Sequence, residues 1–240
     1  MPDSRTHRGA HPEDAGLFGL DRLPALHAAS SDLAWLLDHG YALRSALALT
    51  GDRHGLRQRQ RLAVARCACS REQRQRRDAH RIDPGGLLGS ELWIDGYNLL
   101  ITIESALAGG IILHGRDGCY RDMASLHGTY RMVTETARAA TLIGTALAAC
   151  GVESCHWLLD RPVANSGRLK SVLREIAASA GWRWEVELEF NPDRILIQTT
   201  ALVATSDSVV LDRAERWTNA ARMIIDAAIP EARIVDLSLG

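Results

Sequence analysis

The chain of 240 residues has no apolar run near the ~20 residues that a membrane-spanning helix needs. Its opening stretch, MPDSRTHRGAHPEDAG, has no apolar core of the signal-peptide type. These two absences argue against a membrane protein and against a secreted one. We therefore expect a cytoplasmic protein with no membrane partner.

Cysteine is scarce, and its spacing gives no complete set of zinc ligands. The chain has five cysteines: Cys67, Cys69, Cys119, Cys150 and Cys155. An odd number favours a reducing compartment over a disulfide scaffold. A structural zinc site needs four ligands in closely spaced pairs, and no second suitable pair is present. We interpret these thiols as buried or inert.

Net charge is also nearly absent, at −1, but the two signs are unevenly distributed. Residues 1–90 carry 14 basic and 10 acidic side chains, whereas residues 91–240 carry 14 and 19. Ten arginines and three acids fall within residues 51–82. This pattern predicts a basic module that holds a polyanion, joined to an acidic module with metal-dependent chemistry.

Periodicity and turn residues divide the chain into four parts. We expect a disordered lead-in over 1–22, a small all-helical basic domain over 23–83, a linker over 84–90 and an α/β domain over 91–240. In the helical part, Ser70 and Gln73 have the spacing of a capping box. The linker contains Pro84-Gly85-Gly86.

The last part alternates short apolar runs with helical periods, which predicts a mainly parallel sheet in a three-layer α/β/α arrangement. We expect strands near 91–94, 156–159, 182–190, 201–204 and 233–237. We expect helices near 129–149, 167–180, 192–199 and 212–228.

Three of the expected strands end in an aspartate: Asp95, Asp160 and Asp207. The carboxyl ends of parallel strands lie at one edge of a sheet, so these side chains are expected to converge. Converging carboxylates repel one another unless a cation lies between them, and oxygen ligands suit Mg²⁺ or Mn²⁺. The alternative for each aspartate is that it only caps the following helix.

Two further polar residues follow Asp95. Asn98 is expected to face the same crevice, where its amide can bind a metal-bound water or a phosphate. Glu104 lies about two helical turns farther on and could reach the same edge. The alternative for Glu104 is a solvated side chain.

The string Trp93-Ile94-Asp95-Gly96-Tyr97-Asn98-Leu99-Leu100 resembles the opening of PIN-like and NYN nuclease domains. Ala204-Thr205-Ser206-Asp207-Ser208 resembles the fourth-strand aspartate motif of that superfamily. The whole chain resembles an uncharacterised prokaryotic family in which domain of unknown function 434 precedes such a domain. That part of the resemblance rests on Asp32-Leu33-Ala34-Trp35-Leu36-Leu37, Gly40-Tyr41, Ser45-Ala46-Leu47 and Arg59-Gln60-Arg61.

The resemblance implies metal-binding acids at Asp95, Asp160 and Asp207. It also implies a further acid on a helix between the first two strands, for which Glu104 is the first choice and Glu135 the second. The charged loop of residues 116–122 either borders the site or forms a plain turn at Asp117-Gly118.

Basic and polar side chains are candidates for contacts with phosphate. Ser166 could cap the helix at Gly167 and point its N-terminus at a phosphate, or it could serve only as a cap. The Arg-rich segment either follows a nucleic-acid backbone or forms a solvated helix face. The nucleic-acid-binding candidates are Arg57, Arg61, Arg71, Arg74, Arg77, Arg161, Ser166 and Arg168.

The sequence thus favours a metal-dependent phosphodiesterase, and within that class an endoribonuclease. Asp95, Asp160 and Asp207 would hold Mg²⁺ or Mn²⁺, and Asn98 and Glu104 would orient the attacking water. RNA is favoured as the partner and DNA is the alternative; an oligomer is compatible with the sequence. The other function classes are a non-catalytic RNA-binding or regulatory module, and a DNA-binding regulator that uses the helical domain.

Overall fold

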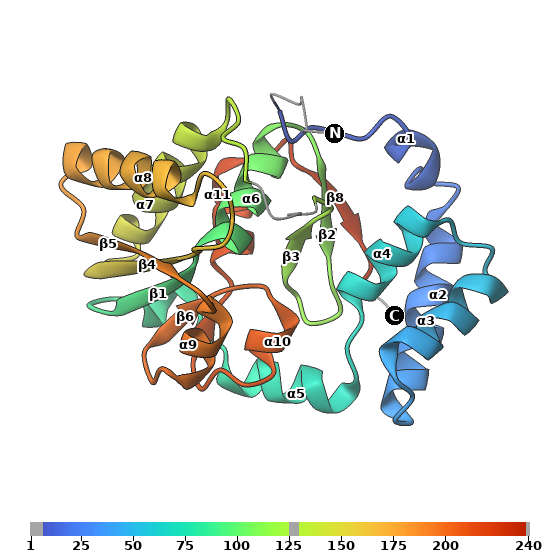
Figure 1. Cartoon of the computed structure of the whole chain (residues 1–240). Helices are drawn as coiled ribbons and strands as arrows, with labels where there is room; N and C mark the ends of the chain where they lie inside the picture. The colour runs from blue at the N-terminus through green and yellow to red at the C-terminus, as the bar shows by residue number, and fades with distance from the viewer. Residues whose placement is uncertain (1–6, 125–129, 239–240) are drawn as a thin grey trace.

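The computed structural model of the chain describes residues 7–124 and 130–238. A helical segment, residues 23–80, precedes an α/β region with two sheets (Figure 1). The helical segment contains α2 (Leu23–Asp38), α3 (Leu43–Arg53), α4 (Gln58–Cys67) and α5 (Arg71–His80). The capping box at the start of α5 is confirmed, because Ser70 Oγ accepts from the Gln73 N–H and the Gln73 side chain accepts from the Ser70 N–H.

The main sheet confirms the α/β class that the strand and helix alternation predicts. Its strands are β1 (Glu91–Asp95), β4 (Ser154–Asp160), β5 (Trp184–Glu189), β6 (Leu202–Ala204) and β7 (Trp217–Thr218). They lie in the order β5-β4-β1-β6-β7, and each neighbouring pair is parallel. All five carboxyl ends therefore lie at one edge.

A second sheet departs from the expected three layers. It has the order β3-β2-β8, with β2 (Ile111–His114), β3 (Tyr120–Asp122) and β8 (Arg233–Asp236). The sequence predicts β8 but not its partner β2. The two strands are separated by more than half the chain, so local patterns do not reveal their pairing. The remaining helices are α6 (Gly96–Leu107), α7 (Thr136–Ala149), α8 (Ser166–Ala180), α9 (Pro192–Gln198), α10 (Ser208–Leu211) and α11 (Ala220–Ala228).

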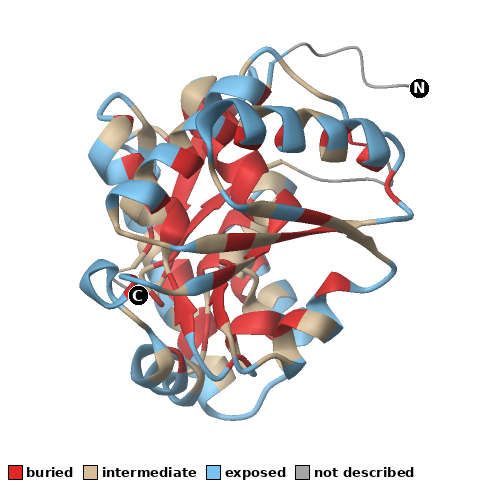
Figure 2. Cartoon of the chain, turned by 90° about the vertical axis from the view of Figure 1, so that its left-hand side faces the viewer, coloured by how far each residue is buried: buried red, intermediate tan, exposed pale blue. Residues whose placement is uncertain are grey.

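Helix α6 lies between the two sheets, which explains why ten of its twelve residues are buried. One face of the second sheet packs with α6 and α11 through Ile112 and Tyr120. The other face packs with α2 and α4 through Ile111, Leu113 and Val235. The helical segment therefore shares a core with the second sheet, and burial is concentrated along the two sheets and α6 (Figure 2).

Three expected segments differ from the structure. The expected helix 129–149 is shorter, because α7 begins at Thr136, and residue 129 lies outside the described residues. The expected helix 212–228 begins only at Ala220, because residues 217–218 form β7, in which Trp217 is fully buried and its indole N–H donates to the Arg77 carbonyl. In the expected lead-in, residues 1–6 lie outside the described part, while α1 (Asp14–Leu17) follows and buries Asp14 against Arg59. No helix among the described residues is long and apolar enough to cross a membrane.

Candidate active site

A pocket of about 330 Å³ opens where β1 and β6 end. The helices that follow these neighbouring strands lie on opposite faces of the sheet: α6 packs in the main core, and α10 packs with α9 in a smaller cluster. Such a switch between neighbouring parallel strands creates a crevice at their carboxyl ends. The pocket is lined by Arg66, Asp95, Tyr97, Asn98, Ile101, Arg121, Asp122, Ala124, Asp193, Ser206, Asp207 and Ser208.

Gly96 allows α6 to begin directly against the neighbouring strand. A Cβ at this position would lie 2.7 Å from the Leu158 carbonyl oxygen and 2.6 Å from Leu159 Cδ2. The backbone oxygen cannot move as a flexible side chain can. Glycine is therefore required for the close approach that places Asp95 and Asn98 at the pocket.

Gly96→Ala should lower the free energy of unfolding by about 1–3 kcal/mol, because α6 must shift away from β4. Gly167→Ala is the matched control, since nothing lies within 4 Å of its Cβ position at the start of α8. Urea unfolding of both variants measures the difference. Equal stability of the two variants would contradict the required close contact.

Asp95 is a buried carboxyl at the end of β1, and its Oδ2 accepts a hydrogen bond of 2.8 Å from Thr205 Oγ1. Burial raises the pKa of Asp95 to about 7, and the negative charges of Asp207, Asp193 and Asp160 act in the same direction. The Thr205 hydrogen bond opposes this shift. Asp95 is thus destabilised as an anion unless a cation binds nearby.

Asp193 is a fourth acid at this edge that the sequence analysis misses. It lies in the first turn of α9, directly after β5, and lines the pocket. Burial raises its pKa, and the charges of Asp207 and Asp160 raise it further. The signal was present, because Asp193 lies three residues after an expected strand, the same spacing as Asp207 after the strand that ends at Ala204. We call Asp95, Asp160, Asp193 and Asp207 the acidic edge.

The other two predicted acids occupy different local settings. Asp207 caps α10, with its Oδ1 accepting from the Val209 and Val210 N–H groups at 2.8 and 3.3 Å. The capping alternative therefore holds for one oxygen, and Asp207 still lines the pocket. Asp160 ends β4 outside the pocket lining, and burial raises its pKa.

Asn98 bridges the two sides of the crevice. Its Oδ1 accepts from the Ser206 backbone N–H at 2.8 Å and from Ser206 Oγ at 2.9 Å. A backbone N–H can only donate, so the oxygen of the amide must face Ser206. This leaves the N–H₂ group for the pocket: Asn98 can donate to a phosphate oxygen, but the acceptor expected for a metal-bound water is already used.

Tyr97 lines the pocket, and its hydroxyl is buried without a hydrogen-bond partner among the described residues. Burial and the charge of Asp160 raise the pKa of Tyr97. The phenol therefore stays protonated.

The structure places Glu104 and Glu135 outside the pocket lining. Glu104 is fully buried and bonded to Arg8, to Tyr130 Oη at 2.5 Å and to Thr136 Oγ1 at 2.6 Å. Burial raises its pKa, and these partners oppose the shift. Glu135 bonds to His7. Glu104 therefore lies in the core between α6 and α7 and not at the edge that its helical spacing suggested.

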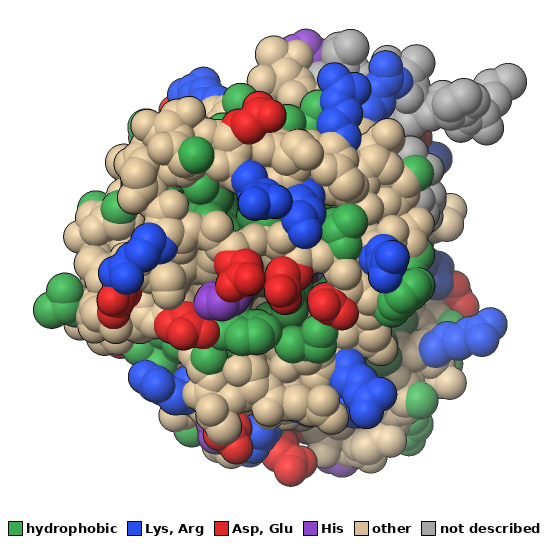
Figure 3. Space-filling view, turned by 60° about the vertical axis from the view of Figure 1, so that its left-hand side comes forward, with side chains coloured by type: hydrophobic (Ala, Val, Ile, Leu, Met, Phe, Trp, Pro, Cys, Tyr) green, Lys and Arg blue, Asp and Glu red, His purple; other side chains and the backbone are tan. Residues whose placement is uncertain are grey.

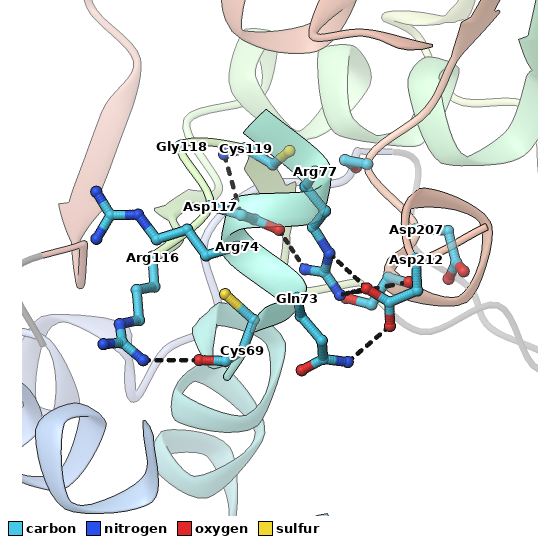
Figure 4. Close-up of polar contacts among 12 residues, drawn as sticks. Cys69, Gln73, Arg74, Arg77, Arg116, Asp117, Gly118, Cys119, Asp207 and Asp212 are labelled. Atoms are coloured by element: carbon cyan, nitrogen blue, oxygen red, sulfur yellow. Dashed lines mark hydrogen bonds and ion pairs between the residues drawn. The ribbon is translucent and has the colours of Figure 1, made fainter. Parts of the chain in front are cut away.

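Arg77 is buried and does not lie on the expected nucleic-acid-binding surface. Its side chain is only 1% exposed and pairs with Asp117 at 2.5 Å and Asp212 at 2.6 Å (Figure 4). Asp117 also accepts two bonds from Arg121, whose Nε donates to the Ser206 carbonyl at 2.7 Å. This buried network connects α5 to the loop that carries Asp207. Arg77 is thus structural, and the 116–122 loop borders the pocket through Arg121 and Asp122.

The other basic candidates are closer to the surface, and several are paired with acids. Arg61 bonds to Asp52 at 2.7 Å, and Arg74 lies 3.8 Å from Asp78. The exposed Arg71 pairs loosely with Asp38, and Arg57 is exposed at the start of α4. These positions stay predictions for nucleic-acid contact.

The start of α8 differs from the expected cap. Asn165, not Ser166, is the N-cap, and it adopts φ 71° while its Nδ2 donates to the Tyr130 carbonyl at 2.9 Å. Ser166 is buried. Arg161 and Arg168 are exposed, and the Arg161 guanidinium stacks over Phe190.

Acidic side chains gather in a band beside a histidine on the side of the molecule where β5 and β4 come forward, with basic side chains around the band (Figure 3). His156 on β4 lies 3.3 Å from Glu91 on β1 and 3.4 Å from Glu185 on β5. In residues 7–124 and 130–238, no three His, Cys, Asp or Glu side chains are grouped closely enough to hold a metal ion by themselves.

Comparison with known proteins matches the chain to two families of unknown function and gives no activity. Residues 84–223 match the family described as Domain of unknown function (DUF5616), and residues 25–79 match the family described as Protein of unknown function (DUF434). The uncharacterised protein MJ0935 of Methanocaldococcus jannaschii is 27% identical over 187 residues, which cover 78% of this chain and 89% of that protein. No solved structure matches the chain. The chain therefore belongs to the DUF5616 family, with a DUF434 region ahead of that domain.

Proposed function

We propose that the protein is a metal-dependent phosphodiesterase, and specifically a nuclease that cuts within RNA. The observation that carries the proposal is the acidic edge, where Asp95, Asp193 and Asp207 line a pocket and Asp160 lies beside it. Several acids facing one crevice, with the pKa of Asp95 raised to about 7, are typical of a functional site rather than of a stable core. The D-G-Y-N resemblance supports RNA as the substrate.

The oxygen donors at the acidic edge fit Mg²⁺ or Mn²⁺ by type. Mg²⁺ is commonly bound through one or two carboxylates, with waters and substrate phosphates completing its shell. Asp95 and Asp207 are the first candidates, because both line the pocket and only one oxygen of Asp207 is used in capping. A bound Mg²⁺ or Mn²⁺ would supply Lewis-acid stabilisation of the phosphoryl group and a more acidic water.

The chain's own residues would orient the phosphate. The Asn98 N–H₂ group is a neutral donor beside the acidic edge, so it can contact a phosphate oxygen without adding negative charge. Donors that strengthen their contacts as charge develops on those oxygens favour the transition state.

The test is cleavage of end-labelled single-stranded RNA and DNA pools by the full chain with Mn²⁺, with Mg²⁺ and with EDTA. We expect internal cleavage of RNA that requires the cation, and no cleavage in EDTA. Binding of RNA without cleavage under all three conditions would reject the nuclease and leave a binding module.

Stability without metal should depend on pH in a way that identifies Asp95. Its folded pKa of about 7 lies above the unfolded value, so the folded state binds the proton more tightly. Stability contributed by this proton is therefore present below pH ~4 and is lost as the pH rises through 7. Asp95→Asn does not lose stability in this way, because asparagine does not titrate. In EDTA at pH 8 the Tm of Asp95→Asn should therefore exceed that of the wild type, and the difference in Tm should be smaller at pH 5. A gap that is constant with pH would show that Asp95 does not titrate in this way.

A further inference from the structure

Arg66 is the one residue of α4 that lines the pocket. Its Nη1 donates to the Asp122 carbonyl, and its Nη2 donates to the Ala124 carbonyl at 2.8 Å. Both partners are neutral oxygens, so they fix the guanidinium without cancelling its charge. The side chain remains 29% exposed, and an arginine has five N–H donors in all.

Asp122 neutralises Arg66 only in part. Its nearest carboxylate oxygen, Oδ1, lies 3.6 Å from Arg66 Nη1, and both carboxylate oxygens accept hydrogen bonds from other groups. Oδ1 accepts from the Ala124 N–H at 2.6 Å, and Oδ2 accepts from Thr102 Oγ1 at 3.0 Å. In contrast, Arg59, Arg61 and Arg77 of the same helical segment bond directly to carboxylates at 2.5–2.7 Å.

The pocket lining therefore carries groups of both charges. The acids Asp95, Asp193 and Asp207 line it, and so does the guanidinium of Arg66 with Asp122 beside it. Asn98 also lines the pocket, with its N–H₂ group free of the bonds that its Oδ1 makes to Ser206. A ligand that suits both charges has oxygen anions for Arg66 and for a cation at the acidic edge.

We propose that Arg66 binds a phosphate group of the substrate and that the helical segment thereby completes the binding pocket. The substrate class is a single-stranded phosphodiester chain, with one phosphate at the acidic edge and a neighbouring phosphate at Arg66. This inference rests on the proposed function for the identity of the chain. It assigns the basic contribution of the helical segment to Arg66 rather than to a row of surface arginines.

The test measures affinity separately from cleavage. A short fluorescein-labelled single-stranded RNA, and a DNA of the same sequence, are titrated with the full chain in Ca²⁺ at several salt concentrations, and anisotropy is recorded. Arg66→Gln should weaken binding about tenfold at low salt and reduce the slope of log K against log salt by ~0.7, as for one lost phosphate contact. Arg44→Gln is the matched control, because it removes an exposed arginine of α3 outside the pocket lining and should leave affinity and slope unchanged.

Arg66→Lys separates charge from local structure. The lysine keeps the positive charge but cannot bridge both carbonyls, so it should retain the salt slope of the wild type with weaker binding. Three results would overturn the proposal. The first is a salt slope in Arg66→Gln equal to that of the wild type, and the second is an equal loss of affinity in Arg66→Gln and Arg66→Lys without a change of slope. The third is binding by the wild type that does not depend on salt.

The binding experiment on Arg66 and the cleavage assay can fail separately. If Arg66→Gln changes the slope but the wild type cuts nothing in Mn²⁺, Arg66 binds phosphate and the proposed activity is wrong. If the wild type cuts RNA and Arg66→Gln cuts it with an unchanged KM, the nuclease stands and the role of Arg66 is wrong.

Discussion

Asp95→Asn should reduce Mn²⁺-dependent cleavage of RNA by at least about 10²-fold, the loss expected when an interaction made chiefly in the transition state is removed. Asparagine keeps the size of the side chain and an oxygen that can accept the hydrogen bond from Thr205. What it removes is the negative charge that a cation at the acidic edge requires. Turnover should therefore fall while the fold remains intact or becomes more stable.

Glu187→Gln is the control for this experiment. It removes one negative charge from β5 of the same sheet, at a residue outside the pocket lining. Initial rates with saturating Mn²⁺ should match the wild type for Glu187→Gln. Similar rates for Asp95→Asn and the wild type would show that cleavage, if present, occurs elsewhere on the molecule.

Asp117→Asn should lower the free energy of unfolding by about 3–5 kcal/mol, because it removes one partner from a buried ion network. Asp117 is 1% exposed and pairs with Arg77 and Arg121, both of which are buried. Without the carboxylate, two guanidinium groups lose their shared counter-charge away from water. Chemical denaturation measures the change, and Asp52→Asn, which breaks an exposed pair with Arg61, should change stability by no more than about 1 kcal/mol.

The effect of Asp117 should depend on pH with the opposite sign to that of Asp95. Despite burial, the guanidinium groups of Arg121 and Arg77 hold the pKa of Asp117 well below its usual range. The stability it contributes is present above the unfolded pKa, near 3.9, and is lost as the pH falls toward the folded pKa. The gap between the wild type and Asp117→Asn should therefore narrow on acidification below pH 4. A gap that widens in acid would contradict the network.

The positions of the acids were predictable because they depend on local sequence. Asp95, Asp160 and Asp193 each follow or end a strand whose apolar pattern is visible, and parallel pairing then brings them to one edge. The start of α5 was predictable for the same reason, since a capping box involves neighbouring residues only.

The rest depends on contacts between distant segments. The strands β2 and β8 are short, and their pairing joins residues 111–114 with residues 233–236. Arg77 and Arg66 look alike in an Arg-rich stretch, yet one meets Asp117 in the core and the other reaches the pocket. Glu104 is covered by Arg8, which comes from a stretch with no regular pattern. Periodicity reports which side of a helix is apolar, but not which partner a charged side chain meets.

The most direct measurement is the binding of Mn²⁺ to the metal-free protein at pH 8, alone and with RNA present. Binding is detected by isothermal titration calorimetry and by loss of the free Mn²⁺ signal in electron paramagnetic resonance. We predict saturable binding in the wild type and in Glu187→Gln, and loss of that binding in Asp95→Asn. Equal binding in Asp95→Asn and the wild type would contradict a metal site at the acidic edge, as would the absence of saturable binding in the wild type with RNA present.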